Sequence, residues 1–424
     1  MKSITIEGPR RFTGRLRVPG DKSISHRALM IAALGRRPCL IRGLSDGDDV
    51  AHTRRAVEAL GARVEVHGTG GVTVAGGLSG APAPIYLGNS GTGIRLMAGL
   101  VAGRDFTTTL DGDASVRRRP MDRVINPLTA MGALVRGSGE SGTSAPLTVE
   151  GRPLRGIKYT LPVASAQVKG AVLLAALGAD GPTTVHEPVT TRAHTEEMLA
   201  AAGVRVERGD GAVTVWPGEV DPPDFDVPGD PSQAAFWLVG ACVAEGSDLT
   251  VENVYVGPAR GGFIEVLRRM GADITVDLES GDIRARSSDL KATRIAAEEL
   301  PGCIDEVPVL AVAAAAADGI TTFEGIDELR VKESDRVAAI VEMVVGVGAG
   351  CQVDGHRLVV TGVGQAHELG SGTFDSHGDH RMAMAAVIAG AAGSGSVTVG
   401  GFEATTTSYP DFANDFAQST GWTP

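Results

Sequence analysis

Residues 18–35 read VPGDKSISHRALMIAALG, and the rest of the chain repeats the pattern of this stretch. The Pro-Gly pair predicts a turn, the polar residues after it predict a helix start, and Gly35 ends the helix. The helix has almost no polar face, and a helix that is apolar all round is buried on every side. Its first turn therefore offers unpaired N–H groups and a positive dipole end, next to Lys22 and Arg27, to an anion.

Five further stretches rich in small residues end at a glycine, as the first does. The six glycines are Gly35, Gly103, Gly178, Gly246, Gly319 and Gly393, and successive ones lie 68, 75, 68, 73 and 74 residues apart. A second, more amphipathic helix is predicted in each unit, and a second series of glycines separates it from a short strand. These are Gly61, Gly132, Gly203, Gly271 and Gly348, at spacings of 71, 71, 68 and 77 residues. Two interleaved series with one period predict six copies of one unit of helices and alternating strands.

Six such units exceed the size of one ordinary core and predict two domains of three units each. The tetrapeptide Val-Pro-Gly-Asp occurs at 18–21 and again at 227–230, which predicts two crossings between the domains. We therefore expect one domain of residues 1–17 plus 231–424, a second of residues 18–230, and a hinge near 18–21 and 227–231. A linear solenoid of the same units is the alternative.

Composition excludes several classes of protein. The net charge of −12 argues against general affinity for nucleic acid or an anionic membrane. The four widely spaced cysteines predict reduced, buried thiols in a cytoplasmic protein, and neither they nor the nine histidines have the spacing of a metal site. No apolar run reaches about 18 residues without glycine or charge, so no transmembrane helix is predicted. The N-terminus also lacks the apolar block of a signal peptide.

Five of the six predicted buried helices begin with residues suited to anions or to proton transfer. These are Lys22, Ser23 and Arg27; the glycine-rich turn 89–93 with Arg95; Ser165 and Gln167; Asp305 and Glu306; and His380 and Arg381. Between the helices lie Arg117, Arg118, Arg119, Arg192, His194, Lys332, Glu333 and Arg336. Each has an ordinary alternative as a plain loop, a solvated charge, a helix cap or a core histidine. Recurrence at equivalent ends of a repeated unit favours a phosphate or carboxylate ligand.

Eight segments carry a resemblance to a known family. They are DKSISHRAL, LGNSGTGIRL, GDASVRRRPM, SAQVKGAVLLAAL, TRAHTEEML, IDEVPVLAVAAA, LRVKESDRVAAI and DHRMAMA, from about residue 18 to residue 412. In this order they resemble the bacterial, class II-like 5-enolpyruvylshikimate-3-phosphate (EPSP) synthases. The resemblance implies an α/β (α+β) fold of two similar domains, each with three βαβαββ units around buried parallel helices. This is the inside-out α/β barrel of enolpyruvyl transferases, with a double-crossover hinge.

The resemblance also implies a reaction. Members transfer the enolpyruvyl group of phosphoenolpyruvate to the 5-hydroxyl of shikimate 3-phosphate, giving EPSP and phosphate, in aromatic amino acid (chorismate) biosynthesis. They use no metal or redox cofactor, and glyphosate inhibits them in competition with phosphoenolpyruvate. We expect a cytoplasmic monomer whose partners are these small molecules.

Residues are assigned by their match to the family's segments. The resemblance assigns shikimate 3-phosphate to Lys22, Ser23, Arg27, Ser165, Ala166, Gln167, Arg192, Asp305 and Lys332. It assigns phosphoenolpyruvate to Lys22, Gly91, Arg119, Gln167, Glu333, Arg336, His380 and Arg381. Several cations would then neutralise two phosphates and a carboxylate.

The implied catalytic residues are Asp305, Glu333, Lys22 and His380. Asp305 accepts the proton of the 5-hydroxyl as that oxygen attacks the enol carbon. Glu333, with Lys22 nearby, delivers a proton to the methylene carbon, and the tetrahedral adduct then expels phosphate.

Two departures and two alternatives accompany this assignment. Thr407 stands where many members have a lysine, so the contact of that lysine is not predicted here. Gly91 stands where glyphosate-tolerant relatives carry alanine, which predicts sensitivity. The sister enzyme that acts on UDP-N-acetylglucosamine has Lys-Asn in place of Lys22-Ser23 and a reactive cysteine in the loop where this chain has residues 113–115. A non-catalytic anion-binding repeat protein is the other alternative, although simple binding needs no carboxyls beside the anions.

Overall fold

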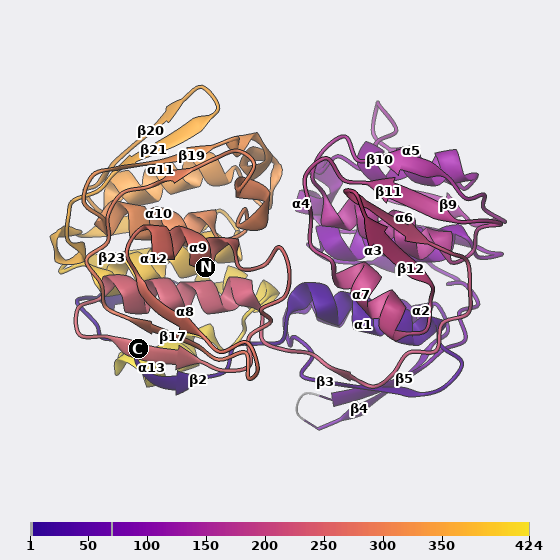
Figure 1. Cartoon of the computed structure of the whole chain (residues 1–424), viewed down its shortest axis with the longest axis horizontal. Helices are drawn as coiled ribbons and strands as arrows, with labels where there is room; N and C mark the ends of the chain where they lie inside the picture. The colour runs from indigo at the N-terminus through magenta and orange to yellow at the C-terminus, as the bar shows by residue number, and fades with distance from the viewer. Residues whose placement is uncertain (1–2, 69–70, 424) are drawn as a thin grey trace. The chain divides into compact units, whose positions relative to one another are not determined.

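The computed structural model describes residues 3–68 and 71–423 and divides the chain into two compact units (Figure 1). The inserted unit is Gly20–Val227, and the terminal unit consists of Met1–Pro19 and Pro228–Pro424. The expected domain limits differ from these by two or three residues. Met1, Lys2 and Pro424, which the expected terminal domain includes, lie outside the described residues. The hinge expected at the two connections stays a prediction.

The inserted unit contains the first three repeats. Its elements are α1 (Lys22–Leu34), β3 (Cys39–Arg42), α2 (Asp48–Ala59), β4 (Arg63–His67), β5 (Gly71–Ala75), β6 (Ile85–Tyr86), α3 (Gly91–Ala102), β7 (Thr107–Asp111), α4 (Ala114–Arg118), α5 (Asp122–Met131), β8 (Leu134–Ser138), β9 (Ser144–Glu150), β10 (Lys158–Thr160), α6 (Ala166–Ala176), β11 (Thr183–His186), α7 (His194–Ala201), β12 (Val206–Gly209), β13 (Ala212–Val215) and β14 (Phe225–Asp226). The sheets have the strand orders β14-β3-β5-β4, β6-β7-β9-β8 and β10-β11-β13-β12. In each sheet the first pair is parallel and the other two pairs are antiparallel.

The terminal unit contains the other three repeats. Its elements are β1 (Ile4–Glu7), β2 (Thr13–Leu16), α8 (Pro231–Val243), β15 (Asp248–Val251), α9 (Gly262–Arg269), β16 (Asp273–Val276), β17 (Ile283–Arg286), β18 (Arg294–Ile295), η1 (Leu300–Gly302), α10 (Val307–Ala316), β19 (Ile320–Glu324), η2 (Ile326–Val331), α11 (Arg336–Gly346), β20 (Gly350–Asp354), β21 (Arg357–Thr361), η3 (Ala366–Glu368), β22 (Gly372–Asp375), α12 (His380–Ala392), β23 (Ser396–Gly400), η4 (Phe402–Thr407) and α13 (Phe412–Thr420). The sheets have the orders β2-β15-β17-β16, β18-β19-β21-β20 and β22-β23-β1.

The N-terminal segment completes two of these sheets. Strand β2 pairs in parallel with β15 of the fourth repeat, and β1 pairs antiparallel with β23 of the sixth. The sixth repeat, expected as a full βαβαββ unit, therefore has a three-stranded sheet within the described residues, and its antiparallel strand comes from the start of the chain.

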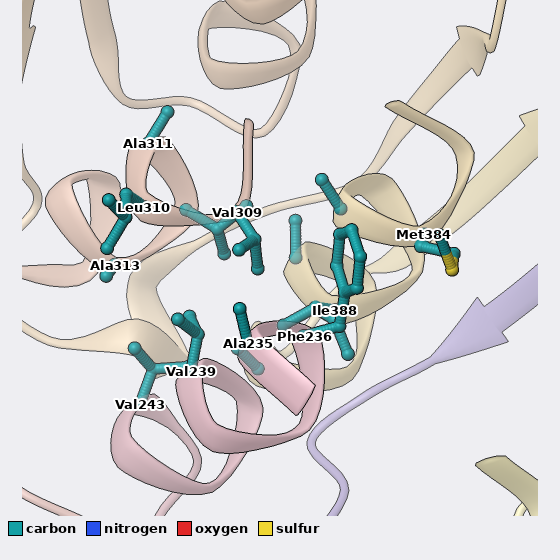
Figure 2. Close-up of a cluster of buried hydrophobic side chains, with 14 of the residues drawn as sticks. Ala235, Phe236, Val239, Val243, Val309, Leu310, Ala311, Ala313, Met384 and Ile388 are labelled. Carbon is teal, nitrogen blue, oxygen red and sulfur yellow. The ribbon is translucent and has the colours of Figure 1, made fainter. Parts of the chain in front are cut away.

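The predicted buried helices are confirmed. Every residue of α8, α10 and α12 is buried, and side chains from all three helices meet in one cluster (Figure 2). Their last-turn residues Val243, Ala316 and Ala392 line one cavity. At the opposite ends, the hydroxyl of Ser232 in α8 donates to Glu306, the N-cap of α10, and Arg381 in α12 donates to the carbonyl of Asp305. The three helices therefore run in the same direction. Within residues 3–68 and 71–423, no helix combines the length and the apolarity that crossing a bilayer requires.

Small residues allow the helices of the inserted unit to pack closely. An ideal Cβ on Gly99 of α3 would lie only 2.1 Å from the carbonyl oxygen of Ala171 on α6. At the far end of the same pair, a Cβ on Gly103 would lie 3.2 Å from the Cα of Gly178. Glycine and alanine thus replace bulky side chains where the two backbones approach, which explains the low aromatic and high glycine content.

Residues that follow an antiparallel strand (β1, β9, β17 or β21) fix the ends of four of the buried helices. The backbone N–H groups of Arg10, Arg152, Ser288 and Val363 donate to carbonyls in the last turns of α12, α3, α8 and α10, at 2.8, 3.1, 2.9 and 2.9 Å. These bonds satisfy carbonyls that the helix cannot pair itself. They fix the position of each of these four helices along its own axis relative to the sheet. The position of the N-terminal end of the helix is therefore fixed as well.

Gly99→Ala is expected to destabilise the protein by about 1–3 kcal/mol, because the added methyl must push α3 away from α6. Gly218→Ala is the matched control, since Gly218 is exposed and a Cβ there meets no atom within 4 Å. Urea denaturation followed by circular dichroism measures both variants. Equal midpoints for Gly99→Ala and the control would contradict the close approach of the helices.

Candidate active site

The predicted site residues fall into two groups, one in each unit. In both groups they lie at the N-terminal ends of the buried helices or in the segments beside those ends. The inserted unit holds Lys22, Ser23, Arg27, Gly91, Arg119, Ser165, Ala166, Gln167 and Arg192, and the terminal unit holds Asp305, Lys332, Glu333, Arg336, His380 and Arg381.

The first turn of α1 presents its cation to a buried carboxylate. Asp21 caps the helix by accepting from the N–H of Ile24 at 2.8 Å. Lys22 Nζ lies 2.9 Å from Asp49 Oδ2, and the side chains are 13% and 6% exposed. Low exposure keeps solvent screening of this ion pair weak and holds the ammonium in one place.

The starts of α3 and α6 are joined by side-chain hydrogen bonds. Arg95 Nη1 donates to Gln167 Oε1 at 2.6 Å, and Gln167 Nε2 donates to Thr92 Oγ1 at 2.9 Å. Nearby, Arg119 is buried and its Nη2 donates to Asn89 Oδ1 at 2.6 Å. These bonds bring together Gly91, Arg119 and Gln167, three of the residues of this unit that were assigned to phosphoenolpyruvate.

Gly91 lies directly under the Arg119 guanidinium. An ideal Cβ at this position would be 2.5 Å from Arg119 Nη1 and 3.2 Å from Arg95 Nη1. Both atoms are the ends of flexible side chains. An alanine here would therefore move arginine head groups rather than backbone.

Residues assigned to shikimate 3-phosphate lie where α1, α6 and α7 begin. Arg27 is buried; its Nε donates to Thr195 Oγ1 at 2.7 Å, and its Nη1 donates to the carbonyl of Ser23 at 2.8 Å. Ser165 caps α6 by accepting from the N–H of Val168. Arg192 is half-buried in the loop just before α7.

In the terminal unit a single guanidinium gathers three carboxylates. Arg336 is fully buried at the start of α11. Its Nε lies 2.8 Å from Asp379 Oδ2, its Nη1 lies 3.3 Å from Asp305 Oδ1, and its Nη2 lies 2.6 Å from Glu333 Oε2. Burial lowers the pKa of Arg336, but the carboxylates of Asp379, Glu333 and Asp305 outweigh burial and raise it above the ordinary value of an arginine. The guanidinium therefore stays charged, and it brings the candidate acid and base to one group.

Further cations surround Asp305. Lys332 Nζ lies 4.0 Å and Arg381 Nε 3.9 Å from Asp305 Oδ1, and Arg381 Nη1 donates to the Asp305 carbonyl at 3.1 Å. Asp379 caps α12 through the N–H of Arg381, and His380 is buried in the same first turn. The predicted carboxylates and cations of this unit are thus brought together, and His380 lies between Asp379 and Arg381 in the chain.

Several residues that hold the site were missed by the sequence reasoning. Asp49, Thr195 and Asp379 contact Lys22, Arg27 and Arg336, which lie 27, 168 and 43 residues away along the chain. Asp379 had a local signal, because aspartate commonly caps a helix. The other two had none.

Comparison with known proteins decides the family. The profile of EPSP synthase (3-phosphoshikimate 1-carboxyvinyltransferase) matches residues 6–416. The chain belongs to the EPSP synthase family. The 3-phosphoshikimate 1-carboxyvinyltransferase of Alkalilimnicola ehrlichii is 50% identical over 414 residues, covering 94% of this chain and 91% of that protein. The resemblance drawn from the eight segments is therefore confirmed.

Solved structures confirm the fold. EPSP synthase from Acinetobacter baumannii superposes with a TM-score of 0.88 at 38% identity, covering 99% of this chain and 98% of that chain. The enolpyruvyl transferase NikO from Streptomyces tendae gives a TM-score of 0.78 at 20% identity, covering 98% and 96% of the two chains. The second similarity is one of fold alone.

One buried histidine supports the helix starts of this EPSP synthase family member. His26 Nδ1 lies 2.7 Å from Thr53 Oγ1, and its Nε2 lies 3.3 Å from Ser90 Oγ, which caps α3. Burial lowers the pKa of His26 well below 6.5, and the charges of Lys22 and Arg27 lower it further. The folded protein therefore holds the ring neutral, whereas the unfolded chain binds a proton near pH 6.5.

The free energy of unfolding is expected to decrease as the pH is lowered below about 6.5. The reason is that His26 binds a proton in the unfolded state at these pH values but not in the folded state. This residue contributes a slope of at most about 1.4 kcal/mol per pH unit, in the direction of greater stability at higher pH. Urea denaturation at a series of pH values, in the wild type and in His26→Asn, isolates the contribution as the difference in slope. Parallel curves would show that His26 is not the group responsible.

Proposed function

We propose that this chain transfers the enolpyruvyl group of phosphoenolpyruvate to the 5-hydroxyl of shikimate 3-phosphate, releasing phosphate. The observation that carries the proposal is the pair of carboxylates, Asp305 and Glu333, that Arg336 holds by ion pairs in a chain of the EPSP synthase family. Two carboxylates beside several cations serve proton transfer next to bound anions, whereas an anion-binding module has no need of them.

The chemistry proceeds by addition and elimination. Asp305 takes the proton of the 5-hydroxyl while that oxygen forms a bond to the enol carbon, and Glu333 gives a proton to the methylene carbon. The methyl group of the tetrahedral adduct then returns a proton to the Glu333 carboxylate, and the carbon–oxygen bond to phosphate breaks as the enolpyruvyl double bond re-forms. Arg336 contacts both carboxylates, so it fixes their positions relative to each other. Held geometry of this kind lowers the entropic part of the barrier.

The two substrates are bound mainly by cations in this proposal. Lys22, Ser23, Arg27, Ser165, Ala166, Gln167, Arg192, Asp305 and Lys332 bind shikimate 3-phosphate. Lys22, Gly91, Arg119, Gln167, Glu333, Arg336, His380 and Arg381 surround phosphoenolpyruvate. Support comes from the helix N-termini at which most of them lie, since such ends favour phosphate and carboxylate groups. Arginine adds planar donors that fit these anions bidentately.

The test is phosphate release from phosphoenolpyruvate with shikimate 3-phosphate in one reaction and UDP-N-acetylglucosamine in another. Release with shikimate 3-phosphate alone is expected. Release only with the nucleotide sugar would move the chain to the sister reaction. No release in either reaction, from folded protein, would favour an anion-binding role.

Asp305→Ala and Glu333→Ala are each expected to lower kcat by a factor of about 100 or more, because each removes a proton-transfer group. Asp327→Ala is the matched control: Asp327 lies in η2 of the same repeat, with a side chain 62% exposed and paired to His356. The control should keep wild-type turnover. A near-normal kcat in folded Asp305→Ala or folded Glu333→Ala would contradict the catalytic role assigned to that residue.

Glyphosate is expected to inhibit the unmodified protein in competition with phosphoenolpyruvate, and Gly91→Ala is expected to weaken that inhibition by about tenfold or more. The added methyl displaces the Arg119 head group and takes up space beside it, which is expected to disfavour the inhibitor more than the substrate. Inhibition curves at fixed phosphoenolpyruvate measure the shift, and the KM for phosphoenolpyruvate shows whether substrate binding survives. Equal sensitivity of the two proteins would contradict this prediction.

A further inference from the structure

A buried cluster of charges holds the loop that carries Arg192. We call it the Lys169 cluster, and it consists of Lys169, Glu187, Thr191 and Glu196. Lys169 lies on α6 with a side chain 1% exposed, and its Nζ is 2.9 Å from Glu187 Oε1 and 2.7 Å from Glu196 Oε1. Glu187 follows β11, and Glu196 lies in the first turn of α7. The cluster therefore ties both ends of the loop to one buried helix.

The cluster grips the backbone next to Arg192. Glu187 Oε1 accepts from the N–H of Thr191 at 3.1 Å and from its hydroxyl at 2.5 Å. Lys169 Nζ lies 3.5 Å from the carbonyl oxygen of Thr191. This carbonyl belongs to the peptide bond that joins Thr191 to Arg192, so the point from which the arginine side chain departs is held on both sides of Thr191.

The same cluster extends to Arg27. Thr195 is the residue before Glu196, and its hydroxyl accepts from Arg27 Nε at 2.7 Å. A Cβ on Gly170, the residue after Lys169, would lie 2.7 Å from that hydroxyl and 3.2 Å from Arg27 Nη2. Helix α6 thus approaches the Thr195–Arg27 pair closely. Two arginines assigned to shikimate 3-phosphate are anchored to one set of buried groups.

A cluster of this kind is an unusual way to fix a loop. Removing an ammonium and two carboxylates from water costs several kcal/mol per ion, and apolar side chains of the same volume would serve stability at least as well. What ionic hydrogen bonds add is direction, because they fix donors and acceptors at set angles. The Thr191 backbone is held in this directional way.

We propose that the Lys169 cluster is a positioning device, which presets Arg192 and Arg27 to bind shikimate 3-phosphate. The proposal rests on the proposed function and names residues that act on substrate through these two arginines. A preset loop loses less conformational freedom when substrate binds, and the gain appears as affinity for that substrate.

Thr191→Val tests the device without leaving a charge unpaired. The substitution removes the hydroxyl that donates to Glu187. The expected result is an increase of about tenfold in the KM for shikimate 3-phosphate. The kcat should stay within about twofold and the KM for phosphoenolpyruvate should not change, since neither the acid nor the base is touched. Thr191→Ser keeps the hydroxyl and should restore the wild-type KM.

Thr184→Val is the matched control. Thr184 lies on β11 near the same loop. Its hydroxyl is hydrogen-bonded to the hydroxyl of Thr214 on the neighbouring strand, at 2.9 Å. The control loses a comparable hydroxyl but should keep the wild-type KM. Glu187→Gln is a second test of the cluster and should raise the KM for shikimate 3-phosphate in the same way as Thr191→Val.

A double variant shows whether the effect passes through Arg192. Arg192→Ala alone should raise the KM for shikimate 3-phosphate, and adding Thr191→Val to it should raise that KM little further. A full additional tenfold increase, a fall in kcat alone, or an unchanged KM in folded Thr191→Val would each overturn the proposal. Phosphate release by the wild type, measured in the same assay, reports on the proposed function separately.

Discussion

The ion pairs of Arg336 are the interaction on which the candidate site depends. Its three carboxylate partners come from three separate segments: Asp305 before α10, Glu333 before α11 and Asp379 at the cap of α12. Apolar packing holds these helices together, but it does not choose the direction of a carboxylate. A fully buried guanidinium does, because its donors point along fixed lines in one plane. Loss of the arginine would leave three carboxylates without their shared cation, which is strongly destabilising in a buried site.

Parallel helices explain why so much charge gathers in each unit. When several helices run in one direction, their positive ends share a face, and lysines and arginines on that face increase the positive potential. Carboxylates such as Asp49 and Asp379 offset part of it, each beside a single cation of the site. Parallel helix N-termini with several cations suit two phosphorylated substrates. The same arrangement also requires buried carboxylates that offset part of the positive charge.

Local patterns predicted the architecture well, because small-residue runs and the glycines that end them carry the repeat. The start of α12 at His380 and of α3 at Gly91 were readable in this way, as were most residues assigned to the site. The partners of those residues could not be predicted. Thr195, for example, contacts Arg27 from 168 residues away along the chain, and no periodic pattern in the sequence indicates that contact. Lys169 was also missed, because a lysine in a helix reads as a solvated charge unless its burial is known. The chemical roles came from the family resemblance and not from spacing.

The strand exchange at the N-terminus has a consequence for how the chain is made. The inserted unit is one continuous segment, Gly20–Val227, so every strand of its sheets is synthesised before translation of the segment Pro228–Pro424 begins. Strand β1 precedes the whole inserted unit in the chain, yet its partner β23 ends at Gly400. Strand β1 must therefore wait, unpaired, until β23 has been translated.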